Sequence, residues 1–183
     1  MTIIIILVVL VILLVVVVGM YNSLVHAKLR VDNAWAQIDT HLKRRFDLIP
    51  NLVETVKGYA KHESETLEKV IAARSSYASA TTEKGKAEAD NMLTDSLKSI
   101  FALAESYPDL KANQNFAALQ EELTSTEDKI AYSRQFFNDA VQMYNTQILV
   151  FPKNIIANMF GFKARDFFEV KDEVQREAVK VQF

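Results

Sequence analysis

The 183-residue chain has a formal net charge of −2, with 21 Lys and Arg against 23 Asp and Glu, and it contains no cysteine. The lack of cysteine excludes disulfides, thiolate metal ligands and cysteine nucleophiles. The interspersed charges do not form the basic field with which a protein attracts nucleic acid, so we expect no nucleic-acid partner. Only four Gly and three Pro interrupt the chain, which favours long helices.

The first predicted element is a membrane-spanning helix. Residues 3–18 are an unbroken run of Ile, Leu and Val, and residues 2–25 carry no charge. At about 1.5 Å per residue these stretches cover roughly 24 Å and 36 Å, which bracket a hydrocarbon core of about 30 Å. A cleaved signal peptide fits less well, because no Lys or Arg precedes the run and residues 19–22 show no Ala-x-Ala pattern. We predict a single-pass anchor over residues 1–21 and one helical domain over residues 22–183.

Basic residues follow the predicted anchor rather than precede it. Lys28 and Arg30 come first, and Lys43, Arg44 and Arg45 follow a few turns later. The positive-inside rule therefore predicts an outside N-terminus and a cytoplasmic C-terminal domain.

The remaining elements are predicted to be helices with one apolar stripe each. From Leu24 to Tyr59 apolar residues recur at spacings of three, four or seven. Whether this helix continues the anchor or folds back is left open. Pro50 predicts either a kink near residues 47–49 or a new helix that begins there with Asp47 as its cap.

Four weaker breaks divide the rest of the chain. A joint is expected at residues 62–65, a loop at 79–86, a helix stop near Ser106, and a connector over 108–114 in which Asn113 can cap the next helix. A helix of about nine turns should then run from Asn115 to Phe151-Pro152, antiparallel to the first. Residues 155–168 predict a short helix, a stop at Gly161 and an aromatic cap or extended segment. The last dozen residues are expected to be loose.

The expected fold is all-α, an N-terminal transmembrane helix followed by an antiparallel bundle of long helices. The candidate core positions lie on the apolar stripes of the two longest predicted helices. Pro50, which interrupts the stripe of the first of these helices, is included among them. They are Trp35, Ile38, Leu42, Pro50, Phe116, Leu123, Ile130, Phe137 and Tyr144.

No grouping of residues predicts a reaction. None of the three histidines stands three residues after a Glu, as the di-metal sites of helical bundles need, and His62-Glu63 lacks the second His of a zinc protease motif. Walker loops, dinucleotide-type glycine patterns and Gly-x-Ser-x-Gly elbows are absent from the sequence. We expect no metal, no cofactor and no enzymatic activity.

One charged cluster is a candidate interaction site, and it consists of Lys43, Arg44, Arg45 and Asp47. It suits anionic headgroups or the acidic patch of a partner. In a straight helix, however, Arg45 lies roughly 35–40 Å beyond the apolar core, too far for headgroups. The alternative is that one arginine pairs with Asp47, Glu54 or an acid on the long C-terminal helix while the others are solvated.

The same residues resemble the LemA family of bacterial membrane-anchored proteins over essentially the whole chain. The resemblance is carried by residues 21–25, 33–39, 42–63 and 107–113, by Thr126-Glu127, Ile130-Ala131 and Tyr144-Asn145, and by Phe151-Pro152 and Phe160-Gly161-Phe162. Phe137-Asn138 departs from a family pattern that often reads Tyr-Asn. The resemblance implies an N-terminal anchor in the inner membrane of a bacterial cell and an antiparallel helical bundle, and it supplies no catalytic residue.

The leading functional hypothesis is a structural or scaffolding protein that self-associates or recruits partners at the membrane through long helices, including coiled-coil contacts. The expected partners are the lipid bilayer, further copies of the chain and a membrane protein. The alternative is an accessory or regulator of a membrane quality-control protease or another membrane enzyme. A third hypothesis is an enzyme whose polar groups do not match a known motif.

Overall fold

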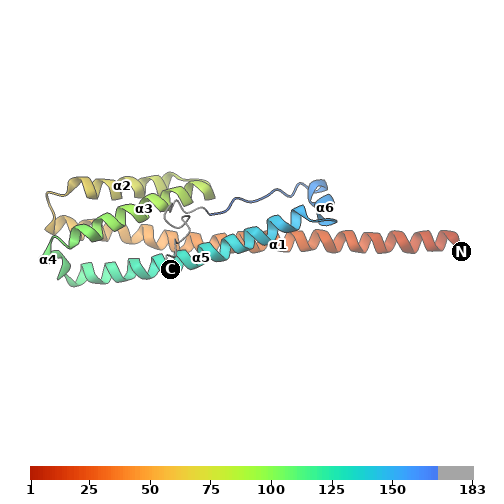
Figure 1. Ribbon diagram of the computed structural model, residues 1–183, viewed down its shortest axis with the longest axis horizontal. Coiled ribbons are helices and arrows are strands. Elements are labelled where there is room, and N and C mark those ends of the chain that lie inside the picture. Colours follow the sequence, from red (N-terminus) through yellow and green to blue (C-terminus); the bar gives the residue numbers. More distant parts are fainter. Residues whose placement is uncertain (169–183) are drawn as a thin grey trace, which may run out of the picture. The chain divides into compact units, whose positions relative to one another are not determined.

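The computed structural model describes residues 1–168, and these contain six helices and no strand (Figure 1). The helices are α1 (Thr2–Tyr59), α2 (Ser64–Ser79), α3 (Glu83–Ala104), α4 (Pro108–Lys111), α5 (Gln114–Leu149) and α6 (Lys153–Met159). The all-α prediction is confirmed. The described residues form two compact units, which we call the anchor unit (residues 1–41 and 129–167) and the bundle unit (residues 42–128 with Phe168).

Helix α1 is continuous from Thr2 to Tyr59, so the apolar run and the following amphipathic stripe belong to one helix. Its N-terminal part is long and apolar enough to cross a membrane, and the side chains of that part are exposed. The boundary predicted at residue 21 falls inside this helix. The question whether the helix folds back after the anchor is therefore settled in favour of continuity.

Pro50 lies inside α1 and is exposed, so the alternative prediction of a new helix at this point is wrong. A proline has no N–H, and it leaves the carbonyl four residues earlier, that of Phe46, without its helical donor. Arg74 of α2 supplies one, because its Nε donates to the Phe46 carbonyl at 3.3 Å. The Arg74 guanidinium also lies 3.9 Å from the centre of the Phe46 ring. This contact from a second helix replaces the hydrogen bond that Pro50 removes.

The bundle unit has one apolar core, formed by α1, α2, α3 and α5 with α4. Its buried side chains include Ile49, Leu52, Val56, Val70, Leu93, Leu97, Ile100, Leu110, Phe116 and Leu123. The joint predicted at 62–65 lies two residues earlier, since α1 ends at Tyr59 and α2 begins at Ser64. The loop predicted at 79–86 is limited to residues 80–82, because the Thr82 hydroxyl accepts from the Gly85 N–H at 3.0 Å and starts α3 there.

The connector before α5 contains the short helix α4, which the sequence did not predict. Asn113 caps α5 as expected, since its side-chain oxygen accepts from the Phe116 N–H at 3.0 Å. Its amide also donates to the Tyr59 hydroxyl at 2.8 Å. Within the bundle unit α5 thus meets the end of α1 with its own beginning, as the predicted antiparallel arrangement requires.

The anchor unit consists of one antiparallel helix pair and the chain that follows it. Ser23 of α1 donates to Gln147 of α5 at 3.2 Å, and the Trp35 and Phe137 rings contact each other with centroids 5.6 Å apart. The predicted short helix is α6, and Gly161, at φ +72°, ends it. Residues 162–168 have no regular structure, and the predicted loose C-terminal end lies outside the described residues.

Candidate functional site

No group of three or more His, Cys, Asp or Glu side chains suitable for a metal occurs in the described part of the chain. Two polar clusters and one groove remain as candidate sites. Each lies within a single unit, and we describe them in turn.

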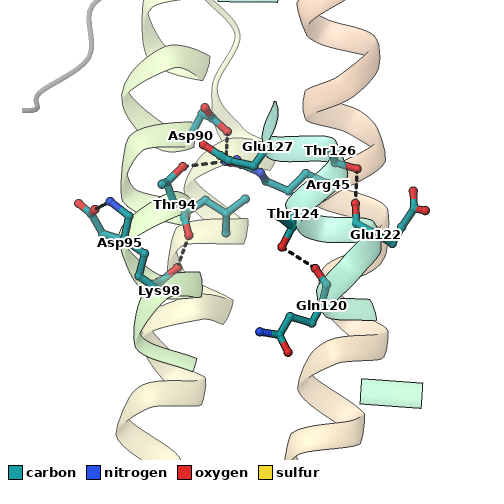
Figure 2. A network of polar contacts seen from close by, with 12 residues as sticks. Arg45, Asp90, Thr94, Asp95, Lys98, Gln120, Glu122, Thr124, Thr126 and Glu127 are labelled. Carbon is teal, nitrogen blue, oxygen red and sulfur yellow. Dashed lines mark hydrogen bonds and ion pairs between the residues drawn. The ribbon is translucent and has the colours of Figure 1, made fainter. Parts of the chain in front are cut away.

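The first cluster surrounds Arg45, whose side chain is only 1% exposed (Figure 2). Its Nη1 atom donates to Asp90 Oδ1 at 2.6 Å and to Thr94 Oγ1 at 2.9 Å, both on α3. Its Nη2 atom forms an ion pair with Glu127 of α5. Asp90 is as buried as Arg45, whereas the Glu127 side chain is 37% exposed. One guanidinium thus connects α1, α3 and α5.

A buried charge is stable only when it is paired and hydrogen-bonded, so the bundle unit can bury Arg45 only if these contacts are formed. The geometry of a planar guanidinium, with donors at fixed angles, also restricts how the three helices are aligned along their axes. The contacts of Arg45 hold α1, α3 and α5 together within the bundle unit.

The structure corrects the view of residues 43–47 as one surface cluster. Arg45 is buried, while Lys43 and Asp47 are exposed. Arg44 pairs with Glu122 of α5 at 2.5 Å, with side chains 52% and 36% exposed. Both arginines thus meet an acid on the long C-terminal helix, whereas the alternative interpretation expected this of one arginine only. The buried partner Asp90 was not predicted.

The structure places most of the candidate core residues inside. Two differ: Trp35 is half-buried against Phe137, and Pro50 is exposed. Buried are Ile38, Leu42, Phe116, Leu123, Ile130, Phe137 and Tyr144.

The second cluster joins the chain after α5 to the helix pair of the anchor unit, and the sequence analysis did not identify it. Lys153 Nζ donates to Ser23 Oγ at 2.8 Å and to Gln147 Oε1 at 3.0 Å. Further along, Asn145 Nδ2 donates to the Arg165 carbonyl and its Oδ1 accepts from the Arg165 N–H, both at 2.9 Å. The Arg165 guanidinium meets Asp32 at 2.6 Å. The bonds of Asn145 and Asp32 to Arg165 hold residues 163–165 against one side of the pair.

Two tyrosine hydroxyls are held in their neutral form. Tyr144 donates to the Lys163 carbonyl at 2.9 Å, and burial raises the pKa of its hydroxyl above the ordinary value. In the bundle unit Tyr107 donates to Glu63 at 2.9 Å, and this hydrogen bond to a carboxylate raises the pKa of Tyr107. Neither hydroxyl is prepared to act as a base at neutral pH.

The groove lies on the other side of the helix pair from residues 163–165. Its α5 residues are Ala140, Met143 and Gln147. At 100° per residue these three lie on the side of α5 opposite to Asn145, which binds Arg165. The face of α5 that contacts α1 lies between these two sides. On α1 the groove is lined by Gly19, Ser23 and Ala27 among others, three small residues at a spacing of four. It encloses about 520 Å³. A Cβ atom added at Gly19 would meet nothing within 4 Å, so the space over this residue is open.

Exposed apolar side chains extend this face along α5. Tyr132, Phe136 and Met143 are exposed, and Phe136 lines a second, shallower groove together with Leu29 of α1. Their spacing places them on one side of α5. The anchor unit thus has a face with small residues and unburied apolar side chains, and no described residue of the chain fills its groove.

Comparison with known proteins identifies relatives of this chain. A sequence model described as the LemA family matches residues 34–183. Protein LemA of Metamycoplasma hominis is 27% identical over 160 residues, which cover 87% of this chain and 73% of that protein. Magnetosome protein MamQ 2 of Paramagnetospirillum magneticum is 31% identical and magnetosome protein MamQ of Magnetospirillum gryphiswaldense 30% identical, each over 83 residues. Those 83 residues cover 45% of this chain but only 30% of each magnetosome protein.

Proposed function

The chain belongs to the LemA family, and from this premise we propose that it is a non-enzymatic membrane scaffold that self-associates through the groove of its anchor unit. That it is a membrane-associated protein is supported by the candidate span and by its relatives. The similarity to proteins named magnetosome protein MamQ agrees with a role at a membrane. The span inserts with its N-terminus outside, because the basic residues follow it.

The observation that carries this proposal is the groove beside the membrane span. Gly19, Ser23 and Ala27 form a small-xxx-small pattern of the kind that lets helix backbones approach closely. The pattern begins one residue after the apolar run, so it continues from the membrane span into the part of α1 that follows it. The pattern forms the α1 wall of an open groove, whose other wall is formed by α5 residues such as Met143. Met143 and Phe136 add apolar side chains on the α5 side of this face. A second copy in the same bilayer presents the same face at the same height, which suits a symmetric contact.

Disulfide crosslinking tests the contact directly, because the natural chain has no cysteine. Met143→Cys places a thiol at the groove, and Gln142→Cys places one on an adjacent exposed residue about 100° away around α5. We expect oxidation in native membranes to give a crosslinked dimer with Met143→Cys and much less with Gln142→Cys. Ala27→Trp, which fills the groove, should abolish the dimer while the helical content is kept.

The other outcomes separate the alternatives. Monomers only, with no stable partner in the same membranes, would show that the scaffold proposal is wrong. Purification of the intact chain with a single membrane protease at fixed stoichiometry would instead support the accessory role. If both cysteine variants crosslink equally, the contact is a random encounter and the groove is not the interface.

A further inference from the structure

The anchor unit carries a second exposed apolar surface, at the end of α5 and around α6. We call it the α5–α6 patch, and its members are Leu149, Val150, Phe151, Ile155, Met159 and Phe160. Phe151 is 78% exposed, Leu149 74% and Met159 68%. Contiguous exposed apolar surface on this scale marks a site of interaction.

Helix α6 is apolar on two sides. Ile156 and Ala157 are buried and dock the helix, while Ile155 and Met159, four residues apart, lie together on the exposed side. A helix on the surface of a water-soluble protein keeps its outward side polar, and one that is apolar all round lies in a core or in contact with lipid. On the outward side of α6 the exposed Asn158 is accompanied by Ile155 and Met159, so this side is more apolar than that of a helix that faces only water.

The contacts of α6 with α1 fix its height relative to the membrane span. The Phe160 and Phe162 rings lie 4.8 Å and 5.8 Å from the Tyr21 ring, centre to centre. Lys153 reaches Ser23, as described above. Figure 1 shows α6 beside α1, at the point from which the N-terminal part of α1 continues alone. The patch is thus held at the level of residues 21–23.

This level lies at the edge of the bilayer. The apolar run ends at Val18, three residues before Tyr21, and three residues of helix span roughly 4.5 Å. The headgroup region on each side of the hydrocarbon core is about 5–8 Å thick. Residues held at Tyr21 are therefore within the headgroup region when the apolar run fills the hydrocarbon core.

The chemistry around the patch fits this region of the bilayer. Aromatic residues such as Tyr21, Phe151 and Phe160 are suited to an interface that is apolar on one side, although Tyr and Trp are the types most enriched there. The nearby charges are basic: Lys28 and Arg30 on α1, and Lys153 and Lys163 after α5. No Asp or Glu occurs in residues 1–31 or 140–165, so an anionic lipid surface meets no acidic side chain of these segments.

We propose that the α5–α6 patch inserts into the boundary between headgroups and acyl chains, in the leaflet from which α1 emerges. The anchor unit then contacts the bilayer twice, through the span and through the patch. A single helix is free to rotate about its axis, whereas a second, lateral contact fixes the rotation and the tilt of α1. The same lateral contact determines which face of the helix pair points sideways, parallel to the membrane plane, towards neighbouring proteins.

Spin-label depth measurements on the full chain test this inference, and the absence of natural cysteines makes every introduced label unique. Phe151→Cys, Ile155→Cys and Met159→Cys carry nitroxides on the patch. Val9→Cys reports the span. Gln135→Cys is the control, an exposed position on α5 about 21 Å from Leu149 along the helix and about 80° around it from Met143, away from the groove. The protein is reconstituted in nanodiscs of phosphatidylcholine with phosphatidylglycerol, and accessibility to oxygen is compared with that to a water-soluble nickel chelate.

We expect oxygen to be favoured at the three patch positions, at a depth between those of Val9→Cys and Gln135→Cys. Adding Ile155→Asp and Met159→Asp should shift the label of Phe151→Cys to water while Val9→Cys stays deep. Patch labels as aqueous as Gln135→Cys, with a deep Val9→Cys, would overturn the inference and leave the anchor intact. Labels shielded from both reagents, with dipolar broadening, would assign the patch to a protein contact instead. The inference rests on the proposed span, so an aqueous Val9→Cys would overturn both.

Discussion

Replacement of Arg45 by methionine is the sharpest test of the packing described above. Methionine keeps an unbranched side chain but removes the guanidinium, so Asp90, at 1% exposure, is left as a buried carboxylate without its cation. Removal of one partner of a buried pair costs about 3–5 kcal/mol of unfolding free energy. The bundle unit has roughly 87 residues (42–128), and at about 0.05–0.15 kcal/mol per residue its total stability is about 4–13 kcal/mol. The substitution should therefore remove a large part of that stability.

Two further variants separate the charge effect from a general effect of substitution. Arg44→Met makes the same change one residue away, in a pair whose side chains are 52% and 36% exposed, and should cost about 1 kcal/mol or less. Arg45→Met combined with Asp90→Leu removes both buried charges and should return to within about 1–2 kcal/mol of the natural chain, because a buried pair replaced by apolar residues is often neutral.

Hydrogen exchange by mass spectrometry on the full chain in nanodiscs measures the effect where it occurs. A loss of 3–5 kcal/mol corresponds to an increase of roughly 10²- to 10⁴-fold in the exchange of protected α3 amides, at 1.36 kcal/mol per factor of ten. A change below about tenfold for Arg45→Met would refute the reasoning. So would a double variant that exchanges as fast as the single one, because the cost would then not come from the uncompensated charge.

Four further outcomes are expected. Arg74→Met leaves the Phe46 carbonyl without a donor and should cost about 1–3 kcal/mol, measured by exchange in α2. Trp35→Ala should cost about 2–3 kcal/mol by chemical denaturation, below the value for a fully buried ring because Trp35 is half-buried; a change under about 1 kcal/mol would mean that the ring faces a partner or solvent. The pKa of Tyr144 is raised in the folded protein, so the contribution of its protonated hydroxyl to the stability of the fold is complete below about pH 10 and is lost as the pH rises through the pKa of the folded state. Unfolding followed by Trp35 fluorescence should therefore show a stability that falls above about pH 10, and the fall should be less steep in Tyr144→Phe. A cysteine at exposed Lys84 should react with an impermeant maleimide only after spheroplasts are permeabilised, and reaction in intact spheroplasts would reverse the proposed orientation.

The helices were predictable because their signal is local. The apolar run and the stripes repeat within a few residues, and they give the helical character of residues 2–59, the long helix α5 and the stop at Gly161. Helix boundaries were less predictable, because a single side chain such as Thr82 moves the start of α3 into an expected loop. The continuity at Pro50 needed a donor from Arg74, a residue 28 positions from Phe46, and no local pattern contains that contact.

The sequence contains a signal that Arg45 is buried, although the pattern of residues 43–45 also suggests an exposed basic cluster. Arg45 occupies a position of the apolar stripe, between Leu42 and Ile49 at spacings of three and four. Asp90 stands likewise three residues before Leu93 on the stripe of α3. A charge at a core position predicts burial with a partner, and that interpretation is stronger than the view of residues 43–45 as one exposed cluster. The choice of Asp90 and Glu127 as partners still depends on how three helices meet.

The two units deal with their apolar residues in different ways, and this difference locates the expected contacts. In the bundle unit α2 and α3 cover the stripes of α1 and α5, so its apolar side chains are mostly buried. In the anchor unit only two long helices face each other, and a pair buries one stripe of each helix while its flanks stay open. Residues 163–165 are held on one flank by Asn145 and Asp32, but the groove beside Ala27 and the α5–α6 patch are not filled by any described residue. Surfaces of this kind are stable where lipid or another protein excludes water from them. We therefore expect substitutions on these two surfaces to change assembly and membrane geometry, whereas substitutions around Arg45 change the stability of the bundle unit.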